Sequence, residues 1–116
     1  MIAHIVLFTP KDGLSSSDKR SFAQSLREAG RQISCIRRAR VGRSIQIDAG
    51  YERSFGETTY QYAAVLEFDD EDGLIEYLKH PKHQELGGLF WKFCDSTAIV
   101  EAEMYSLDDD LAGLMV

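Results

Sequence analysis

The stretch Ile2–Phe8, which reads IAHIVLF, decides the fold because it is apolar on both of its faces. Successive side chains of a β-strand point to opposite faces of the sheet. One face of this stretch therefore carries Ile2, His4, Val6 and Phe8, and the other carries Ala3, Ile5 and Leu7. A strand with water on one side alternates apolar and polar residues, so we expect this one to lie inside a sheet that is covered on both sides.

A second stretch, residues 60–68, repeats this pattern. Leu66 and Phe68 lie on one face, and Ala63 and Val65 make the other face apolar as well. Further strands are expected at residues 36–47 and 95–105, where apolar residues recur at alternate positions. Residues 48–59 show no periodicity and are expected to form an irregular loop.

Helices are expected between these strands. Ser15 and Asp18 have the spacing of a helix N-cap and precede an apolar stripe of Phe22, Leu26, Ala29 and Ile33. Two shorter helices, residues 73–79 and 82–93, are expected on either side of His80-Pro81, because a residue before proline avoids helical geometry.

The resulting β-α-β-β-α-β order predicts an α+β, ferredoxin-like domain with a four-stranded antiparallel sheet and helices on one face. We expect this domain to span residues 1–105, followed by a C-terminal tail at residues 106–116. The second apolar face of the strands then needs a cover. A second copy of the same sheet provides it under two-fold symmetry, so we expect a homodimer through the sheet face that forms a dimeric α+β barrel.

Composition narrows the function classes. The chain has 116 residues, enough for one domain, and a formal net charge of −6, which disfavours nucleic-acid and anionic-membrane partners. No apolar run approaches the roughly 20 residues that span a bilayer. The N-terminal stretch lacks a basic region and a cleavage site, so we expect no signal peptide. With Cys35 and Cys94 expected to be reduced thiols, the predicted location is the cytoplasm.

The most distinctive motif is residues 76–87, EYLKHPKHQELG. It resembles the Y-x-x-H-P-x-H-x-x-x-G stretch of the stress-responsive dimeric A/B barrel (Dabb) family. The strands IAHIVLF (residues 2–8) and YAAVLEF (residues 62–68) look like that family's first and third strands. The resemblance covers residues 1–105, and it implies the same fold and dimer. The family includes plant stress-related proteins, many bacterial proteins of undefined role and the plant olivetolic acid cyclase, which closes a linear tetraketide.

The resemblance to the cyclase implies a catalytic pair at Tyr77 and His83. A neutral imidazole can take a proton from a carbon next to a carbonyl, and a phenol can donate a hydrogen bond to the oxygen that becomes negative. The break at His80-Pro81 is expected to let both face one cavity. We expect His4, Tyr62 and His80 to bind substrate around them. Tyr62 departs from the cyclase, in which a histidine is expected at this position.

Each of these residues also has a structural interpretation. His83 can bond backbone at a helix start, His80 can fix the turn, His4 can be a satisfied core histidine, and Tyr77 can pack its ring and hydrogen-bond its hydroxyl. The three histidines lack the spacing of a metal site, and we predict no metal and no cofactor. Three functions stay open: binding of a small apolar or carbonyl-bearing molecule between sheet and helices, a cyclase or isomerase using Tyr77 and His83, and a purely structural or interaction dimer.

Overall fold

The computed structural model describes residues 1–56 and 60–115. The elements follow one another as β1 (Ile2–Pro10), α1 (Ser16–Gln32), β2 (Arg38–Arg43), α2 (Tyr51–Phe55), β3 (Tyr62–Phe68), α3 (Glu71–Lys79), α4 (Pro81–Phe93), β4 (Cys94–Glu103) and α5 (Leu111–Leu114). The four strands form one antiparallel sheet in the order β2-β3-β1-β4. This is the predicted α+β, ferredoxin-like fold, with β1 and β3 at its centre.

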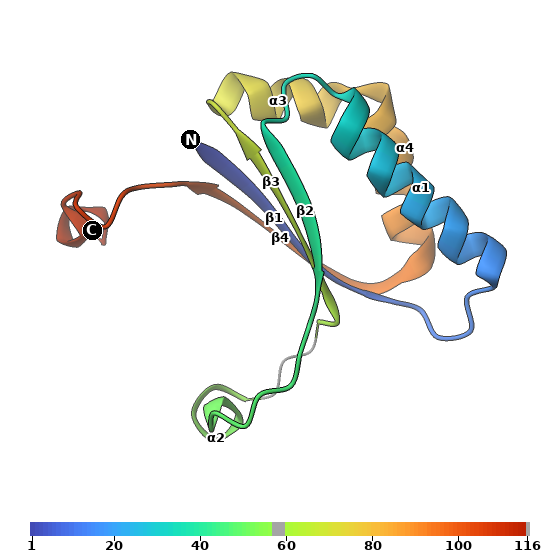
Figure 1. Ribbon diagram of the computed structural model, residues 1–116, viewed down its shortest axis with the longest axis horizontal. Coiled ribbons are helices and arrows are strands. Elements are labelled where there is room, and N and C mark those ends of the chain that lie inside the picture. Colours follow the sequence, from blue (N-terminus) through green and yellow to red (C-terminus); the bar gives the residue numbers. More distant parts are fainter. Residues whose placement is uncertain (57–59, 116) are drawn as a thin grey trace.

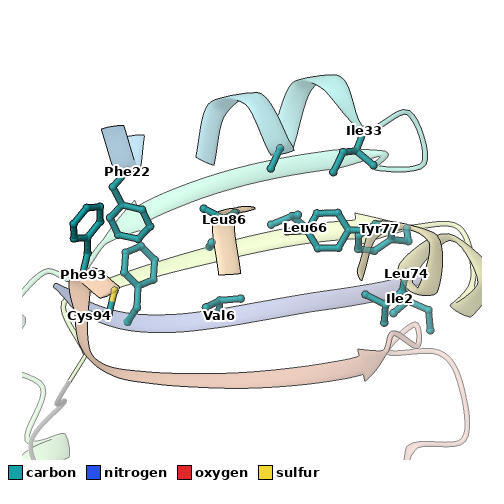
Figure 2. Close-up of a cluster of buried hydrophobic side chains, with 14 residues drawn as sticks. Ile2, Val6, Phe22, Ile33, Leu66, Leu74, Tyr77, Leu86, Phe93 and Cys94 are labelled. Atoms are coloured by element: carbon teal, nitrogen blue, oxygen red, sulfur yellow. The ribbon is translucent and has the colours of Figure 1, made fainter. Parts of the chain in front are cut away.

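The helices α1, α3 and α4 all lie on one side of the sheet (Figure 1). The even-numbered residues of β1 and β3 face them and form the centre of the core, among them Val6, Leu66 and Phe68. Helix α1 contributes Phe22 and Ala29 of its predicted stripe, and Ile33, the residue directly after the helix, is buried as well. Figure 2 shows Val6, Phe22 and Leu66 in this cluster of buried side chains between the sheet and the helices. The face assignment made from alternation is therefore confirmed for both central strands.

The helix ends are set by local side-chain chemistry. The Ser15 hydroxyl accepts a hydrogen bond from the Asp18 backbone N–H at 3.0 Å, and the Asp70 carboxylate accepts one from Gly73 at 2.9 Å. Both bonds satisfy N–H groups that have no partner within the helix. Helix α3 ends at Lys79 and α4 begins at Pro81, so the predicted break at His80-Pro81 is confirmed.

Two expectations about the segment between β2 and β3 are wrong. The second strand was expected to reach Ile47, but β2 ends at Arg43, which pairs with Tyr62 at the start of β3. Beyond that pair the described residues add one backbone bond, from the Ser44 N–H to the Gln61 carbonyl at 2.7 Å, and Ile45 and Ile47 are exposed. The expected loop at residues 48–59 contains a short helix, α2, within its described part, while residues 57–59 of that loop lie outside the described residues.

The sheet face opposite α1, α3 and α4 has no helix over it (Figure 1). It is apolar across β1 and the adjoining parts of β3 and β4, and it carries Arg38, Arg40 and Glu67 towards the β2 edge. Strand pairing places Ile5 beside Val65 and Val100 across this face. Val100 is 52% exposed. The face also carries Ala3, Leu7, Ala63, Ala98 and Ala102, as the registers of β3, β1 and β4 show. The sequence prediction that both faces of the central strands are apolar is thus confirmed, and the second cover is not supplied by this chain's described residues.

The tail after β4 carries α5, whose first turn is capped by the Asp110 carboxylate. It extends away from the sheet edge (Figure 1). Within residues 1–56 and 60–115, no helix has the length and apolar character that crossing a membrane requires.

Candidate functional site

A cavity of about 560 Å³ lies between the sheet and the helices. Its walls come from α1, α4 and the helix-facing residues of all four strands, and they are mostly aliphatic: Val6, Leu26, Leu66, Leu86 and Ile99 are among them. Three polar side chains also line it, His4 from β1, Tyr77 from α3 and His83 from α4. A cavity of this size with an apolar lining and a few convergent polar groups is typical of a small-molecule site.

Tyr77 and His83 meet because the chain turns between their helices. On one continuous helix a separation of six residues would place them about 120° apart around the helix axis. His80, at the junction, has extended backbone with ψ of 139°, and α4 starts in a new direction after it. The ring centres of Tyr77 and His83 are consequently 4.7 Å apart.

The hydrogen bonds of His83 define which of its nitrogens is available. Its Nδ1 lies 3.0 Å from the Leu78 carbonyl oxygen. A carbonyl only accepts, so Nδ1 carries the proton and donates it. In the neutral ring Nε2 then keeps a free lone pair and can act as a base.

The surroundings of His83 favour that neutral ring. Burial lowers the pKa of His83 from its ordinary value of 6.5, and the nearby His4 lowers it further, while the Leu78 carbonyl and Glu101 act in the opposite sense. A charged imidazolium loses hydration in this half-buried position, and this loss outweighs the favourable contacts.

Tyr77 is the complementary group. Its side chain is almost fully buried, at 2% exposure. Burial and the nearby Glu101 carboxylate raise the pKa of Tyr77 to about 12. The phenol therefore keeps its proton near pH 7 and can donate it in a hydrogen bond to an oxygen in the cavity.

His4 completes the group and introduces a residue that the sequence prediction missed. The His4 ring is 5.6 Å from the Tyr77 ring, edge to face. Its Nδ1 donates to the Glu101 carboxylate, with both oxygens at 2.8 Å. Glu101 stands opposite His4 in the β1–β4 register and fixes the orientation of the imidazole. Its sequence signal is weak, because β4 also carries the carboxylates Asp95 and Glu103.

Two of the predicted substrate-binding residues lie elsewhere. Tyr62 stacks on Phe8 with ring centres 5.6 Å apart and does not line the cavity. The Nδ1 of His80 accepts the Lys82 backbone N–H at 3.1 Å, so this side chain caps α4. The structure thus brings together Tyr77, His83 and His4 but leaves Tyr62 and His80 outside the cavity.

No group of three or more His, Cys, Asp or Glu side chains is arranged to hold a metal ion anywhere in residues 1–56 and 60–115. Two arginines of α1, Arg27 and Arg31, line the cavity instead. Neither was among the site residues predicted from the sequence.

The fold and this site define a ferredoxin-like α+β domain with a cavity between sheet and helices. The family model of the Stress responsive A/B Barrel Domain (Dabb) matches residues 2–104, and the chain belongs to this family. The resemblance found in the motif at residues 76–87 is thereby confirmed.

Similar proteins cover nearly the whole chain. An uncharacterized protein of Streptomyces coelicolor, SCO4036, is 31% identical over 105 residues, which are 89% of this chain and 99% of that protein. A protein of unknown function from Bacteroides fragilis, described as dimeric and ferredoxin-like, has 31% identity and a TM-score of 0.61, covering 89% of this chain and 95% of its own.

Two plant structures share the fold at lower identity. The protein At3g17210 of Arabidopsis thaliana superposes with a TM-score of 0.76 at 18% identity, covering 93% of this chain and 99% of its own. The hydroxynitrile lyase of Passiflora edulis superposes with a TM-score of 0.75 at 15% identity, covering 93% and 96%. At these identities the likeness extends to the fold alone.

Proposed function

We propose that this chain is a homodimeric Dabb protein that binds a small apolar, carbonyl-bearing molecule in the cavity between sheet and helices. The carrying observation is the cavity of about 560 Å³, whose aliphatic walls converge on Tyr77, His83 and His4. The aliphatic walls suit an apolar body, and the Tyr77 hydroxyl supplies a donor for one oxygen. The free thiols Cys35 and Cys94 are consistent with a reducing compartment such as the cytoplasm.

The binding proposal is tested by filling the cavity at Gly87. A Cβ atom added at Gly87 meets nothing within 4 Å, and Gly87 lines the cavity. Gly87→Leu therefore places a side chain in the space that a ligand would occupy. It also stabilises α4 by up to about 1 kcal/mol, because glycine is a poor helix former. We expect it to lower the affinity for nonan-2-one, a small ketone with an apolar chain, at least about 10-fold by calorimetric titration.

Gly88→Leu is the matched control for this experiment. Gly88 is the next residue of the same helix, its added Cβ also meets nothing within 4 Å, and it does not line the cavity. The control is expected to gain the same helix stability and to bind nonan-2-one as the parent does. Equal binding by both variants would remove the cavity as the binding site.

A second function, proton transfer next to a carbonyl, is favoured by the geometry of Tyr77 and His83. Their rings are 4.7 Å apart, the His83 Nε2 keeps a lone pair, and Tyr77 stays protonated. With a ketone oxygen bonded to the Tyr77 hydroxyl, His83 would take a proton from the adjacent carbon, and the enolate would be stabilised by the tyrosine. The hydroxynitrile lyase of Passiflora edulis is an enzyme with the same fold, and its similarity to this chain is limited to the fold.

Hydrogen–deuterium exchange measures this step directly. We expect the protein to accelerate exchange of the C1 and C3 hydrogens of nonan-2-one in D₂O, followed by ¹H NMR. His83→Gln should reduce the acceleration about 100-fold and Tyr77→Phe about 10- to 100-fold. Tyr51→Phe, on the exposed helix α2, is the control and should exchange at the parent rate. Exchange at the buffer rate with the unmodified protein would leave only the binding function.

A further inference from the structure

The two cavity arginines, Arg27 and Arg31, have no acidic partner. Arg27 donates to the Gln24 amide at 3.0 Å, and among residues 1–56 and 60–115 neither Arg27 nor Arg31 forms a salt bridge. No Asp or Glu is found among the described residues that line the cavity. This is unexpected for a chain with 19 acidic and 13 basic residues. The cavity therefore combines an apolar wall with a positive rim on an acidic protein.

The acidic residue nearest in sequence to these arginines is already engaged. Glu28 lies between Arg27 and Arg31 in the sequence, yet its carboxylate accepts from Lys82 at 3.2 Å and from Gln24 at 3.1 Å. Glu101, at the other end of the polar cluster, is bonded to His4 and does not line the cavity. The positive charge at the cavity is thus not neutralised by either of these carboxylates.

Arg27 and Arg31 are four residues apart on α1 and so lie on the same face of the helix. A guanidinium presents two parallel N–H donors that match the two oxygens of a carboxylate, and such charge-assisted pairs are stronger than neutral hydrogen bonds. Positive groups beside a cleft with apolar walls also concentrate anions there.

We infer that the ligand of this cavity is an apolar carboxylic acid, whose carboxylate is bound by Arg27 and Arg31 while its apolar body lies against the aliphatic wall. This inference rests on the proposed binding function and adds the charge of the ligand to it.

The test compares two probes of the same chain length, nonanoate and the neutral nonan-2-one, by calorimetric titration at 0.15 M salt. The parent protein should bind nonanoate more tightly than the ketone. In R27Q/R31Q the affinity for nonanoate should fall about 10- to 100-fold, because two charge-assisted contacts are lost. The affinity for nonan-2-one should change less than about 2-fold, because the apolar wall is unaltered.

K19Q/R20Q is the matched control, since it removes two positive charges from exposed positions of the same helix, outside the cavity. It should leave both affinities within about 2-fold of the parent. Binding of nonan-2-one together with an unchanged nonanoate affinity in R27Q/R31Q would overturn the carboxylate inference and keep the binding function. Failure of both probes to bind the parent protein would overturn both proposals.

Discussion

At the scale of single residues, His83 combines a structural and a chemical role. The last carbonyls of a helix have no partner within that helix. The Leu78 carbonyl at the end of α3 accepts both the His83 Nδ1–H at 3.0 Å and the Gln84 side-chain amide at 2.9 Å. The bond that ties α4 to α3 is therefore the same bond that fixes the tautomer of His83. The structural role of His83 therefore belongs to its Nδ1, and the role as a base belongs to its Nε2.

This arrangement predicts how the stability of the protein depends on pH. Burial lowers the pKa of His83 below 6.5. As pH falls through 6.5, the unfolded chain takes up this proton before the folded chain does, so the free energy of unfolding decreases. We expect the His83 ring to titrate below pH 6.5 by NMR. His83→Gln, whose amide can still donate to Leu78, should lose less stability between pH 7.5 and pH 5.5 than the parent does.

Urea unfolding at one fixed protein concentration measures this difference, because an associating protein changes its stability with concentration. The comparison uses the pH dependence of each protein and not its absolute stability, so a constant effect of the substitution cancels. Equal losses in both proteins, or a His83 midpoint at or above 6.5, would contradict the assignment.

At the scale of elements, the sequence predicted what depends on local signals. The cap at Ser15, the break at His80-Pro81 and the alternation in β1 and β3 each arise from neighbouring residues, and the structure has them. The end of β2 was predicted wrongly because a strand needs a partner, and the partner β3 begins only at Tyr62. Ile45 and Ile47 continue the alternation of β2 without continuing the sheet.

The candidate site likewise combines features that local signals predict with features that depend on contacts between distant residues. Tyr77 and His83 are six residues apart, and a local break explains why they meet. Glu101 is 97 residues from His4, and only the β1–β4 register brings the two together. Arg27 and Arg31 belong to the site because the fold places α1 beside the cavity, and no local sequence pattern indicates this. Local sequence patterns therefore do not predict the contacts of the site that join elements far apart in the sequence.

At the scale of the whole molecule, one apolar face of the sheet has no cover within the described chain. Ile5 and Val65 are paired at the centre of that face. Large exposed apolar patches are rare on monomeric proteins. The Bacteroides fragilis neighbour, a ferredoxin-like protein at 31% identity, is described as dimeric. A second copy of the sheet, related by two-fold symmetry, would bury the same patch on both chains.

A charge at the centre of this face should separate the two copies. Ile5→Lys places an ammonium group where the apolar faces would meet, and its burial without a partner is costly. The monomer tolerates it because this face is open to water there. We expect the parent to have twice the 13.1 kDa mass of one chain by light scattering at micromolar concentration, and Ile5→Lys to have the mass of one chain with unchanged circular dichroism.

Ile75→Lys makes the same substitution on α3, on the other side of the sheet, at a residue 44% exposed, and should remain a dimer. A parent protein that scatters as a single chain would exclude the dimer, and a dimeric Ile5→Lys would move the interface away from the sheet face.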